Sequence, residues 1–197
     1  MVKKLTLYND VPCRYFFKSG QENTKAVMEA VSRRCRELPI GKVLVATCSG
    51  KNAFTALKAL DPGVKIIAVT HVTGFVKPDF QELSDKNRRE LQAKGATVLT
   101  CQHAFGGVGR GARRKLATYQ VDEIMAYTLR MFGQGTKVAI ELALMAADAG
   151  LVRTDEDVIS VGGTAEGADT ALVIQPANSA DIFDLKVKEV ICKPAMF

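Results

Sequence analysis

Hydrophobic and polar positions follow two alternating periodicities along the first part of the chain. From residue 23 to about residue 38, apolar side chains recur at the spacing of one helix face, and Asn23 or Thr24 is placed to cap the first turn. The β-branched apolar run 42–47 then predicts a buried strand, and residues 53–60 return to helical spacing until an Asp-Pro-Gly sequence ends it. The pattern therefore predicts helix, strand and helix in succession.

The same unit repeats farther along the chain. Residues 65–70 form another apolar, β-branched run, residues 80–94 have the pattern of a polar amphipathic helix, and residues 97–101 predict a third strand. Two more helical runs cover residues 124–131 and 138–149. Strand and helix alternate through this region, which is typical of a parallel sheet with helical crossovers.

The last third of the chain changes character. Residues 158–161, 170–174 and 187–192 predict short strands, and the first two are too close for a helix between them, so residues 162–169 predict a hairpin. Right-handed crossovers place helices on both faces of a sheet. We therefore expect an α/β fold of three α/β/α layers, with a mostly parallel sheet and an antiparallel edge. No linker or repeat divides the chain, so residues 1–197 are predicted to form one domain.

Composition narrows the class of protein. The chain has 197 residues, 47% of them hydrophobic, and a net charge of 27 − 21 = +6, which suits small anionic partners such as phosphorylated ligands. Five cysteines without a CxxC pair, and no hydrophobic leader, indicate a reduced cytoplasmic protein. The longest apolar run, 138–147, is far shorter than the roughly 20 residues that cross a bilayer, so no membrane span is expected.

Candidate chemistry lies in the loops that follow the strands, because ligands of open parallel sheets bind beyond the carboxyl ends of the strands. The loop after the first buried strand has the small residues, following helix and positive charge of a phosphate cradle. Its residues are Thr47, Cys48, Ser49, Gly50, Lys51 and Asn52. It lacks the GxxxxGK[ST] signature, and an ordinary turn with Ser49 as N-cap explains the same residues.

A glycine-rich stretch, residues 105–111, leads into a basic cluster that runs from Arg110 to Lys115. It does not follow a strand directly as a dinucleotide-binding fingerprint does. A solvated basic loop and a flap that closes over an anionic ligand both account for it, and the solvated loop is the simpler interpretation. Nucleic-acid binding is not expected, because the cluster lacks interleaved aromatic residues.

The two histidines each follow a strand end. His71 and His103 are placed to donate to a ligand, and His103, next to the glycine stretch, is the better candidate. They lie on separate loops without clustered cysteines, so no metal site is expected. Cys48 lies near a helix N-terminus, which can lower the pKa of a thiol, but a small packing residue is the favoured interpretation.

Glu141 interrupts the apolar run 138–147. Together with Lys137 and Asp148 it fits the polar stripe of a helix, which predicts a solvated face or a subunit contact and no catalytic role.

Three segments together resemble the C-terminal α/β domain of pyruvate kinase. They are Asn23-Thr24, the loop 47–53 followed by the strand 66–70, and the segment 161–170 with the sequence VGGTAEGADT. In that family, the corresponding loop and hairpin form the allosteric sugar-bisphosphate site. The resemblance also implies a homodimer or a higher homo-oligomer, since the kinase domain pairs with a copy of itself.

The chain is most similar to stand-alone proteins, archaeal and bacterial, that consist of this domain alone. Residues 20–24, 73–75, 145–148 and 167–170 carry this closer resemblance. The resemblance implies that the protein binds flavin mononucleotide (FMN). It also implies a possible flavin-dependent redox function. The barrel that carries pyruvate kinase chemistry has no counterpart in these residues, so kinase activity is not expected.

One departure from the kinases shapes the expected ligand. Ala165 and Glu166 stand where the regulated kinases place a basic residue for a second phosphate, and a carboxylate there repels one. A ligand with one phosphate and an aromatic body, as in FMN, suits the loops better. The alternative is a regulatory module that senses a phosphorylated metabolite and acts through oligomerisation or a partner. The predicted binding residues are Asn23, Thr24, Thr47, Ser49, Gly50, Lys51, Asn52, Thr73, Gly74, Phe75, His103, Gly162, Gly163 and Gly167.

Overall fold

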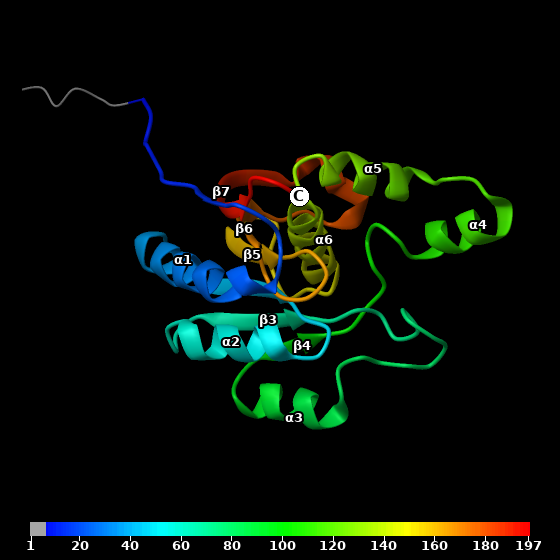
Figure 1. Cartoon of the computed structure of the whole chain (residues 1–197), viewed down its shortest axis with the longest axis horizontal. Coiled ribbons are helices and arrows are strands. Elements are labelled where there is room, and N and C mark those ends of the chain that lie inside the picture. Colours follow the sequence, from blue (N-terminus) through cyan, green and yellow to red (C-terminus); the bar gives the residue numbers. More distant parts are fainter. Residues whose placement is uncertain (1–6) are drawn as a thin grey trace, which may run out of the picture.

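A seven-stranded sheet forms the middle layer of the protein, with helices on both of its faces (Figure 1). The structure is a computed structural model, and it describes residues 7–197. The strands are β1 (Arg14–Phe16), β2 (Lys42–Ala46), β3 (Lys65–Val69), β4 (Thr97–Leu99), β5 (Val158–Gly162), β6 (Thr170–Gln175) and β7 (Lys186–Pro194). The helices are α1 (Thr24–Glu37), α2 (Lys51–Ala59), α3 (Asp85–Ala93), α4 (Val108–Leu116), α5 (Val121–Arg130) and α6 (Gln134–Asp148). Two short 3₁₀ turns, η1 (Gln21–Asn23) and η2 (Ser179–Asp184), complete the elements.

The strand order is β1-β7-β6-β5-β2-β3-β4. Strands β5, β2, β3 and β4 are mutually parallel, and the helices between them make the crossovers that the alternating sequence pattern predicts. Strand β6 runs antiparallel to both β5 and β7, so the predicted hairpin is confirmed. The expected three-layer fold with a mostly parallel sheet is confirmed.

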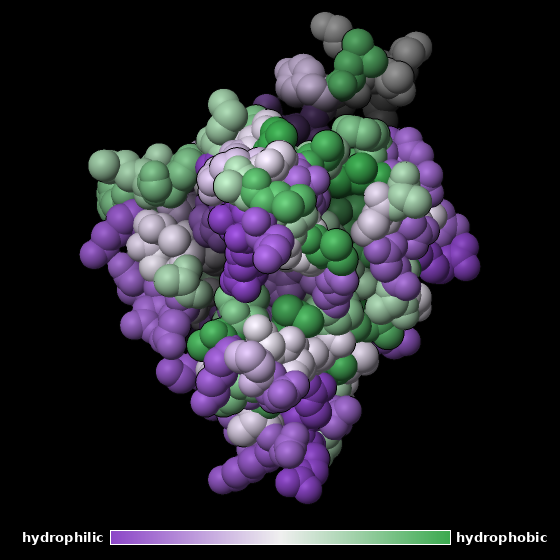
Figure 2. Space-filling view, turned by 90° about the vertical axis from the view of Figure 1, so that its right-hand side faces the viewer, coloured by the Kyte–Doolittle hydropathy of each residue, from purple (hydrophilic) through white to green (hydrophobic). Residues whose placement is uncertain are grey.

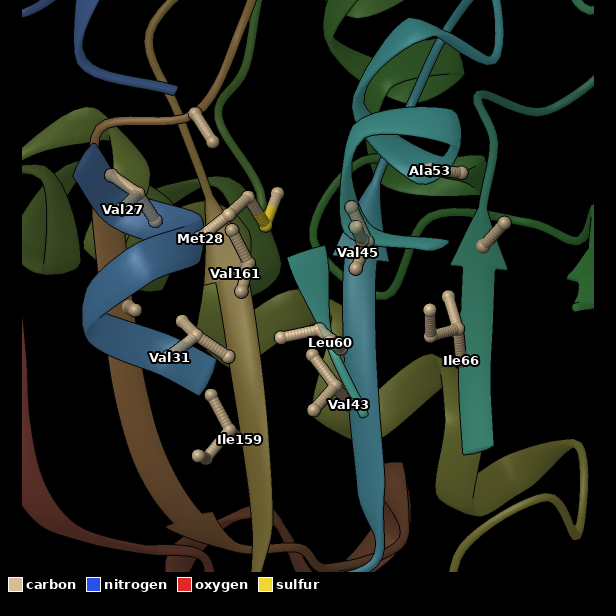
Figure 3. Close-up of a cluster of buried hydrophobic side chains, with 14 of the residues drawn as sticks. Val27, Met28, Val31, Val43, Val45, Ala53, Leu60, Ile66, Ile159 and Val161 are labelled. Atoms are coloured by element: carbon tan, nitrogen blue, oxygen red, sulfur yellow. The ribbon is translucent and has the colours of Figure 1, made fainter. Parts of the chain in front are cut away.

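One hydrophobic core lies between the sheet and the helices α1 and α2 (Figure 3). Val27, Met28 and Val31 of α1 face Ile159 and Val161 of β5, and all five are fully buried. Each such side chain contributes about 1.5–3 kcal/mol by leaving water. This burial explains the helical spacing that the sequence shows in α1, because only one face of that helix contacts the sheet.

A second core lies on the opposite face, where α6 packs on the sheet and α5 lies beside it. Every residue from Gly135 to Ala147 is buried except the half-buried Val138. Helix α6 is therefore covered on almost all sides, including the side that its polar residues occupy. The apolar character of this helix follows from that central position.

The structure differs from the sequence pattern at three elements. Strand β1 was not predicted; it has only three residues and gains its partners from β7 at the far end of the chain. Helix α3 begins at Asp85 and not at residue 80, because the Ser84 hydroxyl accepts a hydrogen bond from the Asn87 amide and fixes the start there. The prediction of a basic loop is wrong from residue 108 onward, because the basic residues lie in helix α4, which begins there.

Within residues 7–197, no helix combines the length and the apolar character that a bilayer crossing requires.

Candidate functional site

A cavity of about 700 Å³ opens at the carboxyl ends of β2 and β3 and is lined by the β5–β6 hairpin, the α2 loop and α6 from Gln134 to Met145. Figure 2 faces this end of the molecule, where hydrophilic and hydrophobic surface are interleaved. Eight of the predicted binding residues line the cavity: Thr24, Thr47, Ser49, Lys51, Asn52, His103, Gly163 and Gly167. The other six, which do not line it, are Asn23, Gly50, Thr73, Gly74, Phe75 and Gly162.

The loop between β2 and α2 lines this cavity, and the N-terminus of α2 follows it directly. Gly50 is the N-cap of α2 and has a left-handed φ of 100°, a conformation that favours glycine. The Thr47 hydroxyl accepts from the Gly50 amide at 3.0 Å, and the Asn52 side chain donates to the Ala46 carbonyl at 3.0 Å. The proposed N-cap role of Ser49 is therefore wrong. The first-turn amides of α2 lack partners within the helix, as at any helix start, and they lie next to Lys51.

The β5–β6 hairpin and the start of α1 form the facing wall. The Thr24 hydroxyl accepts from the Ala168 amide at 3.0 Å and donates to the Gln21 carbonyl at 2.7 Å, so it ties the helix to the hairpin. Asn23 stands at the N-cap position but uses its side chain to donate to the Lys18 carbonyl at 2.8 Å. Neither predicted cap is made by a side chain. These contacts fix the hairpin against α1.

Two hairpin residues have structural roles that the sequence did not reveal. A side chain at Gly162 would overlap the Gly135 carbonyl, so this glycine allows β5 and α6 to approach closely. The fully buried Asp169 accepts from the Thr164 amide at 3.0 Å and from the Gly20 amide at 3.4 Å. Asp169 therefore holds the hairpin in shape and attaches it to the segment that precedes α1.

Three rings form a cluster behind one side of the cavity. His71 stacks on Phe75 with 4.1 Å between ring centroids, and His103 lies 5.2 Å from Phe75 and 5.4 Å from His71. The Arg110 guanidinium of α4 lies over the Phe75 ring, 5.0 Å from its centroid. The two histidines line the cavity and Phe75 supports them from behind, while Thr73 accepts a hydrogen bond from Gln81 outside the lining.

His103 is held neutral. Burial lowers the pKa of His103 to about 4, and the nearby Glu141 carboxylate opposes that shift only in part. The Val72 amide donates to Nε2 of His103 at 3.3 Å, which requires an unprotonated nitrogen. At neutral pH the ring is therefore an uncharged wall of the cavity.

Glu141 lies inside the protein, so its predicted place on a solvated stripe is wrong. Its carboxylate bonds to the Lys137 ammonium at 2.5 Å and accepts from the Phe105 amide at 2.9 Å, and both charged side chains are only 5% exposed. Burial lowers the pKa of Lys137, although the Glu141 carboxylate opposes this shift. Of the proposed polar stripe, only Asp148 is exposed. The pattern along one helix did not reveal that α5 and the segment 103–105 cover this face.

A cysteine, a histidine and a glutamate meet at the edge of the cavity. Nδ1 of His71 lies 2.6 Å from the Glu82 carboxylate, and the Cys48 sulfur lies 3.5 and 3.6 Å from the two ring nitrogens. Burial, with smaller contributions from Glu82 and Glu166, raises the pKa of the Cys48 thiol to about 11. The interpretation of Cys48 as a thiol of lowered pKa is therefore wrong. Glu82 was missed because nothing in its local sequence distinguishes it.

The remaining wall of the cavity is apolar. Val138, Leu142 and Met145 face it from α6, and Phe80 lies on the opposite side. The charged groups in the lining, apart from the histidines, are one cation, Lys51, and three carboxylates, Glu82, Glu141 and Glu166. The cavity thus has a polar end at the α2 loop and a mostly apolar end against α6, where Gln134 and Glu141 are the polar residues.

Two comparisons relate this chain to known proteins. The family model described as "Pyruvate kinase, alpha/beta domain" matches residues 25–174. Among solved structures, the chain is similar to Cryptosporidium parvum pyruvate kinase in complex with ADP, with 16% identity and a TM-score of 0.39. That match covers 76% of this chain and 22% of the kinase, so the chain spans about a fifth of the length of that enzyme. Because the family model matches most of its length, the chain belongs to the pyruvate kinase alpha/beta domain family.

Proposed function

We propose that the protein binds a ligand with one phosphate group and an aromatic ring system, with FMN as the candidate, and that it has no pyruvate kinase activity. The observation that carries the proposal is a single cavity with a phosphate-type polar end and an apolar end. A cavity of about 700 Å³ is within the range of small-molecule sites, roughly 300–1,000 Å³.

The polar end suits one phosphate. The N-terminus of α2, whose first-turn amides carry a partial positive charge, lies at the cavity, and Ser49 and Thr47 also line it. Lys51 is the one lysine in the lining, and Glu166 lies 3.9 Å from it. A second phosphate near Glu166 would meet a carboxylate, so a bisphosphate is disfavoured.

The apolar end suits a flat ring system. Leu142 and Met145 offer an apolar surface, and Phe80, His71 and the neutral His103 offer aromatic faces. Phe75 does not reach the cavity and acts by fixing the two histidine rings. We therefore propose that the ring system binds nearer α6 than the sequence motif 73–75 indicated.

Bound flavin would supply hydride or electron-transfer chemistry, and the chain would hold and orient it. We assign no catalytic residue. We also place the protein in the cytoplasm, because all five cysteines are free thiols, as expected in a reducing compartment.

The visible absorption spectrum of the purified protein tests the proposal, together with mass spectrometry of ligand released by heating. Flavin-free protein is then titrated with FMN, and quenching of flavin fluorescence gives the affinity. Ser49→Asp should weaken FMN binding at least about tenfold, because it places a negative charge among the phosphate donors.

Helix α2 offers a matched pair of lysine variants. Lys51 lines the cavity at the N-terminus of this helix, whereas Lys58 lies exposed in its last turn. Lys51→Met should weaken FMN binding several-fold and Lys58→Met should leave it unchanged. A colourless protein that takes up no added FMN would overturn the proposal, as would equal effects of the two lysine variants.

An apolar groove favours the second candidate, a regulatory module that acts through a second copy of the chain. Tyr119, Ile124, Tyr127, Thr128 and Met131 line a groove of about 510 Å³ at α5, on the opposite side of that helix from its contact with α6. Exposed apolar side chains gathered in one place mark association surfaces. Sedimentation velocity with and without FMN measures the oligomeric state of the protein. A ligand-dependent change in mass, abolished by Ile124→Glu, is the expected result for a module of this kind.

A further inference from the structure

Three side chains of the types that bind zinc converge at one edge of the cavity. Cys48 follows β2, His71 follows β3, and Glu82 lies just before α3, so three separate segments contribute one group each. Their ligand atoms all lie within 4.8 Å of one another. The geometry points to a zinc-binding site formed by Cys48, His71 and Glu82.

The distances suit a tetrahedral ion. Ligand atoms at 2.0–2.3 Å from zinc lie roughly 3.2–3.8 Å apart, as tetrahedral geometry requires. The Cys48 sulfur lies 3.5 Å from Nδ1 and 3.6 Å from Nε2 of His71, so it lies over the ring, and the Cys48 side chain must turn toward the Nδ1 side to share an ion with that nitrogen. Nδ1 and the Glu82 oxygen are closer, at the hydrogen-bond distance of 2.6 Å. Glu82 is one-quarter exposed and needs to withdraw by less than about 1 Å to admit the ion.

The chemistry of the three groups selects the ion. A thiolate, an imidazole and a carboxylate are the ligands of zinc, whereas calcium and magnesium bind through oxygen alone. The thiolate and the carboxylate together balance the two positive charges of Zn²⁺, so the occupied site is neutral. Binding uses the thiolate of Cys48 and a ring-nitrogen lone pair of His71, so zinc uptake displaces the Cys48 thiol proton.

Neighbouring hydrogen bonds hold the three segments in place. The Gln81 side chain donates to the His71 carbonyl at 3.0 Å and accepts from the Leu83 amide at 3.0 Å, which fixes the chain on both sides of Glu82. The Asn87 side chain donates to the Ser49 carbonyl at 2.8 Å and so joins α3 to the cysteine loop. A site supported in this way keeps its geometry when the ion arrives.

The site has three protein ligands and faces the cavity, since all three residues contribute to its lining. Structural zinc sites are closed by four protein ligands, whereas three ligands leave a position for water or a bound molecule. We therefore assign the open position to an oxygen atom of a ligand in the cavity. The three zinc ligands are separate from the amides and hydroxyls assigned to the phosphate, and only His71 is shared with the wall assigned to the ring system.

Metal titration tests this inference. Flavin-free protein is treated with a chelator, then titrated with Zn²⁺ against a chromophoric competitor, and bound metal is counted by mass spectrometry. We expect one zinc per chain. In a parallel titration with Co²⁺, an intense sulfur-to-cobalt charge-transfer band is expected, because it reports a thiolate ligand directly in the unmutated protein.

Substitutions identify the ligands. Cys48→Ser, His71→Gln and Glu82→Gln should each weaken zinc binding at least tenfold. Cys101→Ser is the matched control, because Cys101 is also half-buried beyond a strand end and is absent from the cluster. It should leave zinc affinity unchanged. Ser49→Asp should reduce FMN binding and retain zinc, which separates failure of this inference from failure of the flavin proposal.

Two results would overturn the inference. One is a protein that binds no zinc above the level of the Cys48→Ser variant. The other is a cobalt complex without the thiolate band, which would place the metal elsewhere.

Discussion

The ion pair of Lys137 and Glu141 gives the sharpest energetic prediction for this protein. Both side chains are 5% exposed and bond to each other at 2.5 Å, and Glu141 also accepts from the Phe105 amide. Glu141→Gln keeps an acceptor for that amide and removes the charge that compensates Lys137. Breaking a buried pair in this way costs about 3–5 kcal/mol of stability, because the remaining charge is buried away from water without a compensating partner.

Burial already lowers the pKa of Lys137, so loss of its partner favours the neutral amine. Neutralisation limits the penalty, and we expect Glu141→Gln to reduce the free energy of unfolding by about 3 kcal/mol, the lower end of that range. Lys137→Met should cost a similar amount, since it leaves the carboxylate without its cation. The double variant should lie within about 1–2 kcal/mol of the unmutated protein, because only polar, uncharged groups are then buried.

Urea denaturation at neutral pH, with linear extrapolation to water, measures all four members of the cycle. The matched control is Glu90→Gln, because Glu90 and Lys94 form a pair of the same four-residue spacing on α3 with side chains about half exposed. Such a pair contributes less than about 1 kcal/mol. Equal losses for Glu141→Gln and Glu90→Gln, or additive losses in the double variant, would refute the reasoning.

Three further predictions concern the same end of the sheet. Because the pKa of His103 is about 4 in the folded protein and about 6.5 when unfolded, only the unfolded state gains this proton between those values. Lowering the pH from 6.5 to 4 should therefore cost up to about 3 kcal/mol of stability, and the loss should be smaller by that amount in His103→Gln, measured by denaturation at each pH. Asp169→Ala should cost about 2–3 kcal/mol in thermal unfolding, since the Thr164 amide loses a charged acceptor; a loss below that of an exposed Asp→Ala change would contradict its role. Gly162→Ala should destabilise by more than 1 kcal/mol through overlap with Gly135, and an unchanged melting temperature would argue against that close approach.

Much of the candidate site followed from strand ends alone. The carboxyl ends of parallel neighbours share one edge of a sheet, so the loop 47–52, His103 and the hairpin residues Gly163 and Gly167 were expected together. All of them except Gly50 line one cavity. Gly162 does not line the cavity and packs against α6, because a glycine required for packing on a helix has the same sequence signature as one required beside a ligand.

The sequence by itself determined which strands and helices follow one another along the chain, the hairpin and the three-layer class, because these depend on periodicities within short segments. Only the tertiary structure decided which polar side chains meet. Glu141 is buried because α6 is covered by α5 as well as by the sheet, and Cys48, His71 and Glu82 converge because β2 and β3 are neighbours while α3 returns beside them. Local patterns encode which face of an element is apolar, but a contact between residues distant in sequence depends on how several elements pack at once.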